Sequence, residues 1–539
     1  MYVWKKNIFV TQQYTFIYTH FIMADIHILW VDDEIDLLRS HILFLETKGY
    51  KVTTANSGND ALVLCKTEFF DIAFLDENMP GLSGLETLSE IKKWQPLLPV
   101  IMITKSEEED IMEQAIGKKI ADYLIKPVNP NQIVMAIKKT LHSKQLISDK
   151  TTSSYQSAFS HIGRQINDTS SFEDWTKVYQ DLVYWELELE HVDNQMDSLL
   201  LMQKNEANSH FTKFVKKNYQ AWFEPNDDKP LMSPDIFKTK IFPLLDKGEK
   251  VFFVVLDNLR LDQWKVLQKE LSSLFHTTED ELYCGILPTA TQYARNAIFA
   301  GLMPLQIQKM YPQLWVDEEE DDGKNMMEED LLKTQFERFR KKYSFSYHKI
   351  NTSQAGEKLN EQLHQHLAND LNVVVFNFID MLSHVRTESK IFKELVPDEA
   401  AYRSLILSWF KHSSINEFFR QLAEKGVKVV LTTDHGTIRT QNPIKVVGDK
   451  HTNTNLRYKV GKNLSYNQKD VFSVIQPELI GLPKPNISSH YIFATQEDFF
   501  AYPNNYNHYV SYYKDTFQHG GISLEEMLIP IVLLEPKRK

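Results

Sequence analysis

Two hydrophobic periodicities alternate along the chain and divide it into regions. Residues 23–146 alternate short apolar runs with segments of helical spacing, and residues 147–249 show long helical patterns with one apolar face. Residues 250–539 return to near-continuous apolar runs, which are typical of strands buried on both faces of a sheet. The expected strands are 26–31, 51–54, 71–75, 100–104 and 122–125 in the first region, and 250–256, 372–379, 427–433 and 529–534 in the last.

This alternation predicts an α/β protein with three parts. Five strand–helix units within residues 23–146 indicate a doubly wound, five-stranded parallel sheet. Residues 147–249 predict a helical linker or bundle, and residues 250–539 predict a larger α/β domain. Residues 1–22 lie outside the pattern, and we interpret them as an extension that is not part of the fold.

Composition narrows the classes of function. The net charge of -12 argues against a general binder of polyanions. The two cysteines, Cys65 and Cys284, are too few for a disulfide framework or a thiolate metal cage, and they suit a reducing cytoplasm. No run of 18 apolar residues occurs, so we expect no membrane-spanning helix.

Polar side chains stand at the ends of four expected strands in the first region. Because the carboxyl ends of parallel strands meet at one edge of a sheet, these side chains would converge. Three carboxylates in one crevice repel each other unless they hold a cation, and such an oxygen set suits Mg²⁺. The alternative is that these residues are helix caps and surface charges. The residues are Asp32, Asp33, Asp76, Thr104 and Lys126.

The first region resembles the receiver domains of two-component response regulators over its whole length, and these domains have a flavodoxin-like fold. The resemblance implies that Asp76 accepts a phosphoryl group from a sensor histidine kinase. It also implies that Asp32, Asp33 and Asp76 bind Mg²⁺, with the main-chain carbonyl of Asn78 as a further ligand.

The same resemblance implies a conformational switch. Thr104 and Tyr123 would reorient on phosphorylation, and Lys126 would pair with the phosphoryl charge through a loop in which the Lys126–Pro127 bond is cis. We expect phosphorylation to produce a homodimer.

The middle region carries no signal for a DNA-reading domain. Negative charge on its helices argues against a surface that faces phosphates. A solvated helix face explains this charge, and we expect the region to transmit the state of the receiver or to contribute contacts for pairing. The acidic residues are Glu186, Glu188, Glu190, Asp193 and Asp197.

Carboxylates also follow three expected strands of the last region, and histidines accompany them. Asp380 and His384 are four residues apart, so they would share a face of a helical turn. Mixed carboxylate and imidazole sets suit Zn²⁺ or Mn²⁺, and two such ions can clamp the oxygens of phosphoryl transfer. The potential ligands divide into Asp257, Asp434 and His435 in one group, and Asp380, His384 and His519 in the other.

A nucleophile is required beside such metals, and the segment LPTATQYARNAIFAG offers Thr289. This residue follows Pro288 at the expected start of a helix that runs towards Gly301. A helix N-terminus offers free N–H groups to a phosphate, and metal coordination activates a hydroxyl. Taken alone, Thr289 would be an ordinary helix N-cap.

The metal-ligand candidates and Thr289, taken in their order along the chain, resemble the motifs of the alkaline phosphatase superfamily. The resemblance is to its PglZ domains in particular, and it covers nearly all of residues 250–539. The resemblance implies two Zn²⁺ sites and a phosphodiesterase rather than a sulfatase, because the nucleophile position holds Thr289. One Zn²⁺ would be held by Asp257, Thr289, Asp434 and His435, and the other by Asp380, His384 and His519.

The segment between His435 and His519 contains a basic stretch in an otherwise acidic protein. It is either a solvated face or a surface that steers a nucleotide or oligonucleotide backbone. The substrate-binding candidates are Asn258, Arg439, Lys450 and His451.

Receiver, helical linker and PglZ-like domain, in this order, resemble the PorX-type response regulators. The resemblance implies a cytoplasmic regulator of type IX secretion in which phosphorylation of Asp76 controls a zinc phosphodiesterase acting on nucleotides or oligonucleotides. The alternative is a non-catalytic, metal-bound scaffold that binds a sigma factor or a component of the secretion machinery in response to phosphorylation.

Overall fold

The computed structural model describes residues 26–95, 98–105, 120–190, 196–224, 229–317, 325–449 and 452–537. The chain divides into two compact units, the first ending at Thr151 and the second running from Thr152 to Lys539. The expected helical bundle is therefore no separate unit, because its helices share one hydrophobic core with the C-terminal domain. The extension expected at residues 1–22 lies outside the described residues.

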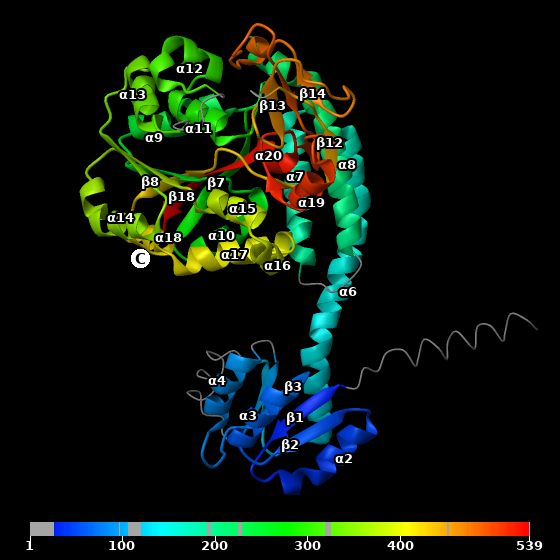
Figure 1. The fold of residues 1–539 in the computed structure, drawn as a ribbon. Helices are drawn as coiled ribbons and strands as arrows, with labels where there is room; N and C mark the ends of the chain where they lie inside the picture. The colour runs from blue at the N-terminus through cyan, green and yellow to red at the C-terminus, as the bar shows by residue number, and fades with distance from the viewer. Residues whose placement is uncertain are drawn as a thin grey trace, which may run out of the picture. The chain divides into compact units, whose positions relative to one another are not determined.

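A five-stranded parallel sheet forms the first unit, as the sequence predicts (Figure 1). The strand order is β2-β1-β3-β4-β5, and apolar clusters cover both faces. The strands are β1 (His27–Val31), β2 (Lys51–Ala55), β3 (Ile72–Asp76), β4 (Val100–Thr104) and β5 (Asp122–Ile125). The described helices are η1 (Ile35–Leu38), α2 (Arg39–Thr47), α3 (Gly58–Thr67), α4 (Gly84–Trp94) and α6 (Pro130–Asp168).

Local sequence explains where these elements begin and how deeply they are buried. The central strand β3, with sequence IAFLD, is buried at every position, whereas the edge strand β5 alternates between half-buried and exposed side chains. Helix α4 begins at a capping box formed by Ser83 and Glu86. Helix α6 continues across the boundary between the two units.

Two long helices follow α6 in the second unit, α7 (Phe172–Leu189) and α8 (Met196–Asn218), and they pack against each other. The apolar stripe of α7, which includes Trp175, Val178 and Leu182, is fully buried. Short helical turns then lead to the central sheet: η2 (Gln220–Phe223), η3 (Ser233–Asp235), η4 (Phe237–Ile241) and α9 (Phe242–Asp246).

The central sheet of the second unit has the strand order β7-β18-β10-β6-β9-β8. Strands β10, β6, β9 and β8 are parallel, β18 runs antiparallel to β10, and β7 runs antiparallel to β18. The bounds are β6 (Val251–Leu256), β7 (Phe275–Cys284), β8 (Phe345–Ile350), β9 (Leu371–Phe376), β10 (Lys428–Thr432) and β18 (Leu528–Pro536).

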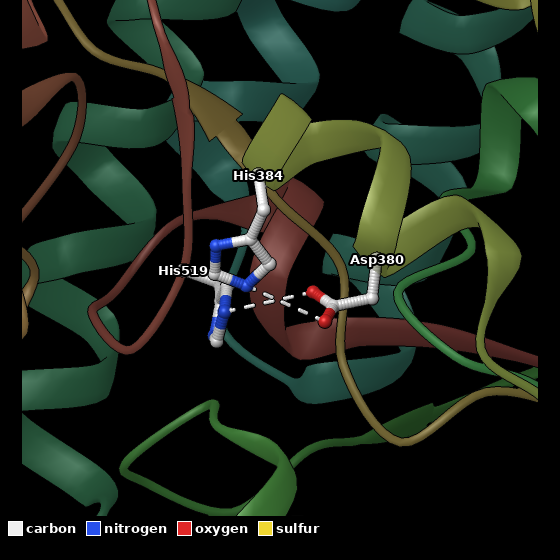
Figure 2. Close-up of side chains that lie close together, drawn as sticks. All are labelled: Asp380, His384 and His519. Carbon is white, nitrogen blue, oxygen red and sulfur yellow. Dashed lines mark ion pairs between the residues drawn. The ribbon is translucent and has the colours of Figure 1, made fainter. Parts of the chain in front are cut away.

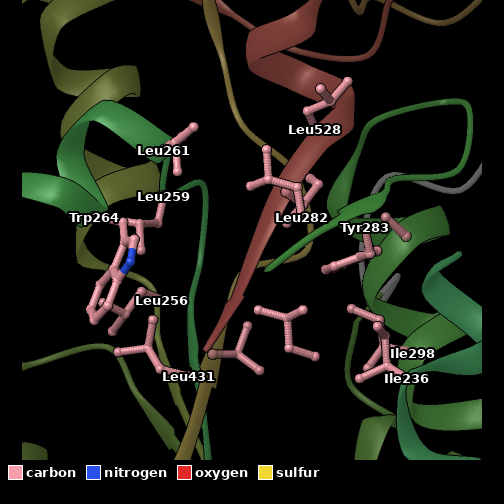
Figure 3. Close-up of a cluster of buried hydrophobic side chains, with 14 of the residues drawn as sticks. Ile236, Leu256, Leu259, Leu261, Trp264, Leu282, Tyr283, Ile298, Leu431 and Leu528 are labelled. Atoms are coloured by element: carbon pink, nitrogen blue, oxygen red, sulfur yellow. The ribbon is translucent and has the colours of Figure 1, made fainter. Parts of the chain in front are cut away.

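Helices cover both faces of this sheet (Figure 1). Apolar side chains such as Leu256, Leu259, Leu431 and Tyr283 fill the core beneath the carboxyl ends of the parallel strands (Figure 3). The helices are α10 (Leu261–Leu271), α11 (Thr291–Ala300), α12 (Pro304–Met310), η5 (Pro312–Leu314), α13 (Glu328–Arg338), α14 (Ser353–His366), α15 (Phe378–Glu388), α16 (Lys390–Leu395), α17 (Glu399–His412), α18 (Ser414–Glu424) and α20 (Leu524–Met527).

Short strands lie in the segment between β10 and β18, and they form three small sheets. The pairs are β11 (Ile438–Arg439) with β17 (Phe517–Gln518), and β12 (Asn442–Lys445) with β16 (Asp498–Ala501). The third sheet contains β13 (Tyr458–Gly461), β15 (His490–Phe493) and β14 (Phe472–Val474). Helices η6 (Pro477–Ile480) and α19 (Tyr506–Tyr513) complete the segment.

One expected strand is too long. The apolar run 372–379 suggested a strand that continues to Asp380, but β9 ends at Phe376 and α15 begins at Phe378. The error arises because only one polar residue, Asn377, separates the apolar end of β9 from the apolar residues Phe378 and Ile379 that begin α15. Asp380 therefore lies in the first turn of α15, not directly after a strand.

Candidate functional site

Parallel strands of the second unit bring the expected metal ligands to one edge of the sheet. Asp257 directly follows β6, and Asp434 and His435 lie two and three residues beyond β10. Asp380 and His384 share one face of α15, which follows β9, and His519 follows β17. The structure thus forms both of the expected groups of three.

The first group is buried and its ligand atoms converge. The Nε2 atom of His435 lies 4.0 Å from Oδ1 of Asp257 and 3.8 Å from Oδ2 of Asp434. Within the described residues, neither of these two carboxylate oxygens has a hydrogen-bond partner. Because buried carboxylate oxygens are costly without partners, this arrangement fits a divalent cation.

The second group lies closer to solvent. His384 places Nε2 3.5 Å from Oδ2 of Asp380, and His519 places Nε2 3.9 Å from Oδ1 of the same carboxylate (Figure 2). The side chain of His384 is 64% exposed, so a ligand can reach this group from outside. The rings of His435 and His519 stack at 4.2 Å, which makes the two groups neighbours.

Backbone carbonyls fix the orientation of both inner histidines. Nδ1 of His435 lies 3.2 Å from the carbonyl oxygen of Gly436, and Nδ1 of His519 lies 3.0 Å from that of Thr289. A carbonyl oxygen only accepts hydrogen bonds, so Nδ1 carries the proton and the lone pair of Nε2 faces the carboxylates. Burial lowers the pKa of His435, and burial together with His435 lowers the pKa of His519 to about 4, which keeps both rings neutral.

The carboxylates of the two groups repel each other in a buried environment. Burial, with Asp434 and Asp380 nearby, raises the pKa of Asp257 to about 8 although Arg295 opposes this shift. Burial likewise raises the pKa of Asp434. A bound divalent cation would offset this repulsion, so the electrostatics and the donor set both fit Zn²⁺.

Asn258 connects the two groups. It adopts a left-handed conformation with φ of 68°, which Asn tolerates better than most residues. Its backbone N–H donates to Oδ1 of Asp434 at 3.4 Å, and its side-chain amide donates to Oδ1 of Asp380 at 3.2 Å. Asn258 is fully buried, and these contacts hold the carboxylates of both groups in place. Its expected role in binding substrate stays a prediction.

The structure places the hydroxyl of Thr289 differently from the expectation. Its Oγ1 accepts a hydrogen bond from the backbone N–H of Gly520 at 3.0 Å and donates to the carbonyl of Gly521 at 3.1 Å. Helix α11 begins at Thr291, with Ala290 as the N-cap, so Thr289 precedes the helix. Buried and bonded in this way, the Thr289 hydroxyl supports the loop that follows His519.

The hydroxyl that lies beside the first group belongs to Thr291, whereas the sequence led us to expect that of Thr289. Thr291 is the first residue of α11, and its Oγ1 lies 3.1 Å from Nε2 of His435. Thr291 and Arg295 are four residues apart on α11, and Nη1 of Arg295 donates to Oδ2 of Asp257 at 2.7 Å. The sequence feature that could have identified both residues is their spacing of four, which places them on one face of the helix.

The substrate-binding candidates of the basic stretch are only partly described. Arg439 lies in β11 and forms an ion pair with Asp515 at 3.0 Å. Strand β11 pairs with β17, and β17 ends one residue before His519. Arg439 therefore lies on a strand that pairs next to a ligand of the second group. Lys450 and His451 fall outside the described residues.

The first unit gathers its own acidic site at the carboxyl edge of the receiver sheet. Asp32, Asp33 and Asp76 form the expected group of three carboxylates. Lys126 donates to Oδ2 of both Asp32 and Asp76 at 2.9 Å, and Oδ1 of Asp76 has no hydrogen-bond partner among the described residues. Burial raises the pKa of Asp76, although Lys126 opposes this shift. These carboxylates fit Mg²⁺, and the partnerless oxygen fits a phosphoacceptor.

The remaining receiver residues also lie at this edge. Thr104 ends β4 and is buried, whereas Tyr123 in β5 is 39% exposed. The Lys126–Pro127 bond is cis, as the resemblance implied. Asn78 is exposed in the loop after β3, and the role of its carbonyl stays a prediction.

Comparisons with protein families assign all three parts of the chain. The model of the BREX system PglZ alkaline phosphatase-like domain matches residues 236–534, more than half of the chain. The receiver-domain model of response regulators matches residues 28–138, and the PorX response regulator linker domain matches residues 145–223. The chain belongs to the PglZ family and has the domains of a PorX-type response regulator. The PglZ match begins at residue 236, ahead of the boundary expected at 250.

Individual relatives are similar over short parts of the chain. The alginate biosynthesis regulatory protein AlgB of Pseudomonas syringae pv. tomato is 39% identical over 119 residues, which are 22% of this chain and 27% of AlgB. The transcriptional regulatory protein ZraR of Escherichia coli K12 is 32% identical over 140 residues, which are 26% of this chain and 32% of ZraR. The chain thus spans about a third or less of the relatives it matches.

Solved structures resemble this PorX-type chain over a similarly short part. A CheY-like receiver domain from Methanospirillum hungatei is 32% identical and covers 22% of this chain and 94% of its own, with a TM-score of 0.21. Within the part that the structure describes, no helix has the length and apolar character needed to cross a membrane.

Proposed function

We propose that the protein is a response regulator in which phosphorylation of Asp76 controls a zinc-dependent phosphodiesterase acting on nucleotides or oligonucleotides. The observation that carries the catalytic part is the convergence at one sheet edge of two carboxylate–histidine groups with the hydroxyl of Thr291. A sensor histidine kinase would supply the phosphoryl group, as the receiver family implies.

Each group of ligands would hold one Zn²⁺. Asp257, Asp434 and His435 would hold the buried ion, and Asp380, His384 and His519 would hold the ion nearer to solvent. When bound, the two ions would supply Lewis-acid stabilisation of the phosphoryl oxygens and lower the pKa of an attacking hydroxyl. The neutral Nε2 atoms of the two inner histidines and the partnerless carboxylate oxygens support this assignment.

Thr291 would act as the nucleophile. Its hydroxyl lies at the first turn of α11, where free backbone N–H groups favour a bound phosphate. Attack of Oγ1 on phosphorus would form a phosphothreonine ester while the P–O bond to the leaving alcohol breaks and that alcohol takes up a proton. Water would then cleave the ester and restore Thr291. This assignment replaces Thr289, whose hydroxyl already bonds Gly520 and Gly521 in the loop after His519.

The choice of a diester and of a nucleotide rests on the family resemblance and on the basic stretch between β10 and β18. Arg439 and the lysines Lys445, Lys459 and Lys462 give this stretch positive charge in a chain with a net charge of -12. Regulation of type IX secretion, with a sigma factor or a secretion component as partner, follows from the likeness to PorX-type regulators.

The test compares Thr291→Val with Thr291→Ser in the zinc-loaded full chain, using hydrolysis of bis-p-nitrophenyl phosphate. Valine keeps the shape but removes the hydroxyl, so kcat/KM should fall on the order of 10³-fold or more, while zinc content stays at the wild-type level. Serine keeps the hydroxyl and should retain much of the activity. If wild type and Thr291→Val bind zinc and hydrolyse the diester equally, Thr291 is not the nucleophile; if neither hydrolyses it, the metal-bound scaffold is favoured.

A further inference from the structure

Arg295 is a buried cation beside the first group of ligands. Its side chain is 1% exposed, and Nη1 donates to Oδ2 of Asp257 at 2.7 Å and lies 3.8 Å from Oδ2 of Asp434. The guanidinium therefore hydrogen-bonds Oδ2 of Asp257. The other oxygen, Oδ1, has no hydrogen-bond partner among the described residues. Oδ1 is the oxygen that faces Nε2 of His435.

Glu328, the first residue of α13, holds the opposite edge of this guanidinium. Its Oε1 accepts from Nε of Arg295 at 2.6 Å, and its side chain is 1% exposed. The other oxygen accepts from the hydroxyl of Tyr347 and from Nζ of Lys349, the latter at 3.3 Å. Glu328 is thus fixed from β8 and in turn fixes Arg295, although it contacts none of the proposed metal ligands directly.

We propose that Arg295, held by Glu328, is the positioning residue of the buried metal site: it occupies Oδ2 of Asp257 so that Oδ1 is presented to the ion. This inference rests on the proposed two-zinc centre. A guanidinium forms directed hydrogen bonds with planar geometry, so it fixes the carboxylate plane of Asp257 more firmly than a point charge would. Outer partners of this kind orient metal ligands in other metalloproteins.

The charges of Arg295 and Glu328 act on zinc affinity in opposite directions. A positive guanidinium close to a divalent ion weakens binding of that ion, and the carboxylate of Glu328 offsets this repulsion. Replacing Glu328 with glutamine removes the offset and one charge-assisted bond while keeping the size of the side chain. We expect Glu328→Gln to weaken zinc binding at the buried site about 10–100-fold, the usual cost of losing such an outer partner.

The experiment is a zinc titration of the full chain in competition with a chromophoric chelator, which needs no catalytic readout. Wild type should bind two Zn²⁺ with resolvable affinities. In Glu328→Gln one of the two should weaken while the other keeps its affinity, because Arg295 pairs with Glu328 and with Asp257 and Asp434, which belong to the buried site. The unchanged site therefore serves as an internal control for folding.

Two further variants separate positioning from general packing. Tyr347→Phe removes one donor to Glu328 but keeps the charges of Glu328 and Arg295, so zinc affinity should change less than about threefold. Arg295→Lys keeps the charge but cannot bridge Asp257 and Glu328 with the same geometry, so the buried site should weaken. Wild-type affinities at both sites in Glu328→Gln and Arg295→Lys, or equal losses at both sites, would overturn the inference. A wild type that binds fewer than two ions would instead overturn the two-zinc centre on which it rests.

Discussion

Gly436 shows how tightly single residues are packed behind the candidate metal centre. A Cβ atom at this position would lie 2.0 Å from the backbone carbonyl oxygen of Glu525. Because that contact is with backbone, no side-chain rotation can relieve it. Glycine at 436 therefore allows the loop that carries Asp434 and His435 to lie against α20.

The corresponding prediction is that Gly436→Ala destabilises the protein by about 1–3 kcal/mol, the usual cost of overpacking. The free energy of unfolding of the second unit within the full chain, measured by urea denaturation, tests it. Gly163→Ala in α6 is the matched control, since its nearest neighbour would lie 3.9 Å from the new Cβ. The control should be neutral or stabilise by about 0.5–1 kcal/mol. Equal stability of Gly436→Ala and wild type would contradict the close approach.

The two threonines near α11 could not be told apart as site residues from the sequence alone. Thr289 and Thr291 are both plausible at a helix start, and the sequence alone does not locate the N-cap. The structure separates them because α11 begins at Thr291, whose hydroxyl meets His435, whereas Gly520 and Gly521 engage Thr289. Choosing between them requires the position of the loop after His519, which is more than 200 residues away in the chain.

At the scale of elements, α8 is connected to the metal-bearing loop through α20. Asn208 in α8 accepts from the backbone N–H of Leu524 at 2.8 Å and donates to Oε2 of Glu525 at 3.0 Å. Lys204, one turn earlier, forms an ion pair with the same carboxylate at 3.6 Å. The carbonyl of Glu525 in turn lies against Gly436. The linker helices therefore support the loop that holds Asp434 and His435.

We predict that Asn208→Ala destabilises the second unit by about 2–4 kcal/mol, because a buried N–H and a buried carboxylate oxygen each lose a partner. Chemical denaturation of the full chain measures this loss. Glu206→Gln, on the exposed face of the same helix, is the control and should change stability by less than about 0.5 kcal/mol. A variant Asn208→Ala as stable as the control would show that this contact does not couple α8 to α20.

Elements with strong periodicity were predictable, and those without it were not. Receiver strands β1, β3 and β4 and the strands that precede Asp257 and Asp434 follow from buried apolar runs. Strand β7 gives no such signal, because side chains His276 to Glu279 face solvent at an edge of the sheet. The small sheets between β10 and β18 are stabilised by pairing across long loops, which local patterns do not encode.

At the scale of the whole molecule, the receiver site and the candidate metal centre lie in different compact units of one chain. Helix α6 runs from the receiver into the second unit, where Tyr155 and the carbonyl of Phe159 both hydrogen-bond Gln203 of α8. Gln203 adjoins Lys204 in sequence, so the part of α6 within the second unit contacts the same part of α8 that supports α20.

We predict that phosphorylation of Asp76 converts the chain to a homodimer. A phosphoryl group adds about -1.5 to -2 charge beside Lys126 and Thr104 and so changes the electrostatics of the receiver edge. Sedimentation velocity with and without beryllofluoride and Mg²⁺ should show a doubling of mass. Asp76→Asn is the control and should keep one mass under both conditions. Wild type with an unchanged mass would contradict phosphorylation-driven pairing.

The most direct test of control over catalysis is the rate at which the zinc-loaded full chain hydrolyses a dinucleotide, with and without beryllofluoride in the presence of Mg²⁺. Wild type should change its rate by a factor well beyond the error of the assay, whereas Asp76→Asn should hydrolyse at one rate under both conditions, because it lacks the acceptor carboxylate. Hydrolysis by wild type at the same rate in both states, or a zinc-loaded wild type that cleaves no diester, would contradict a receiver-controlled phosphodiesterase.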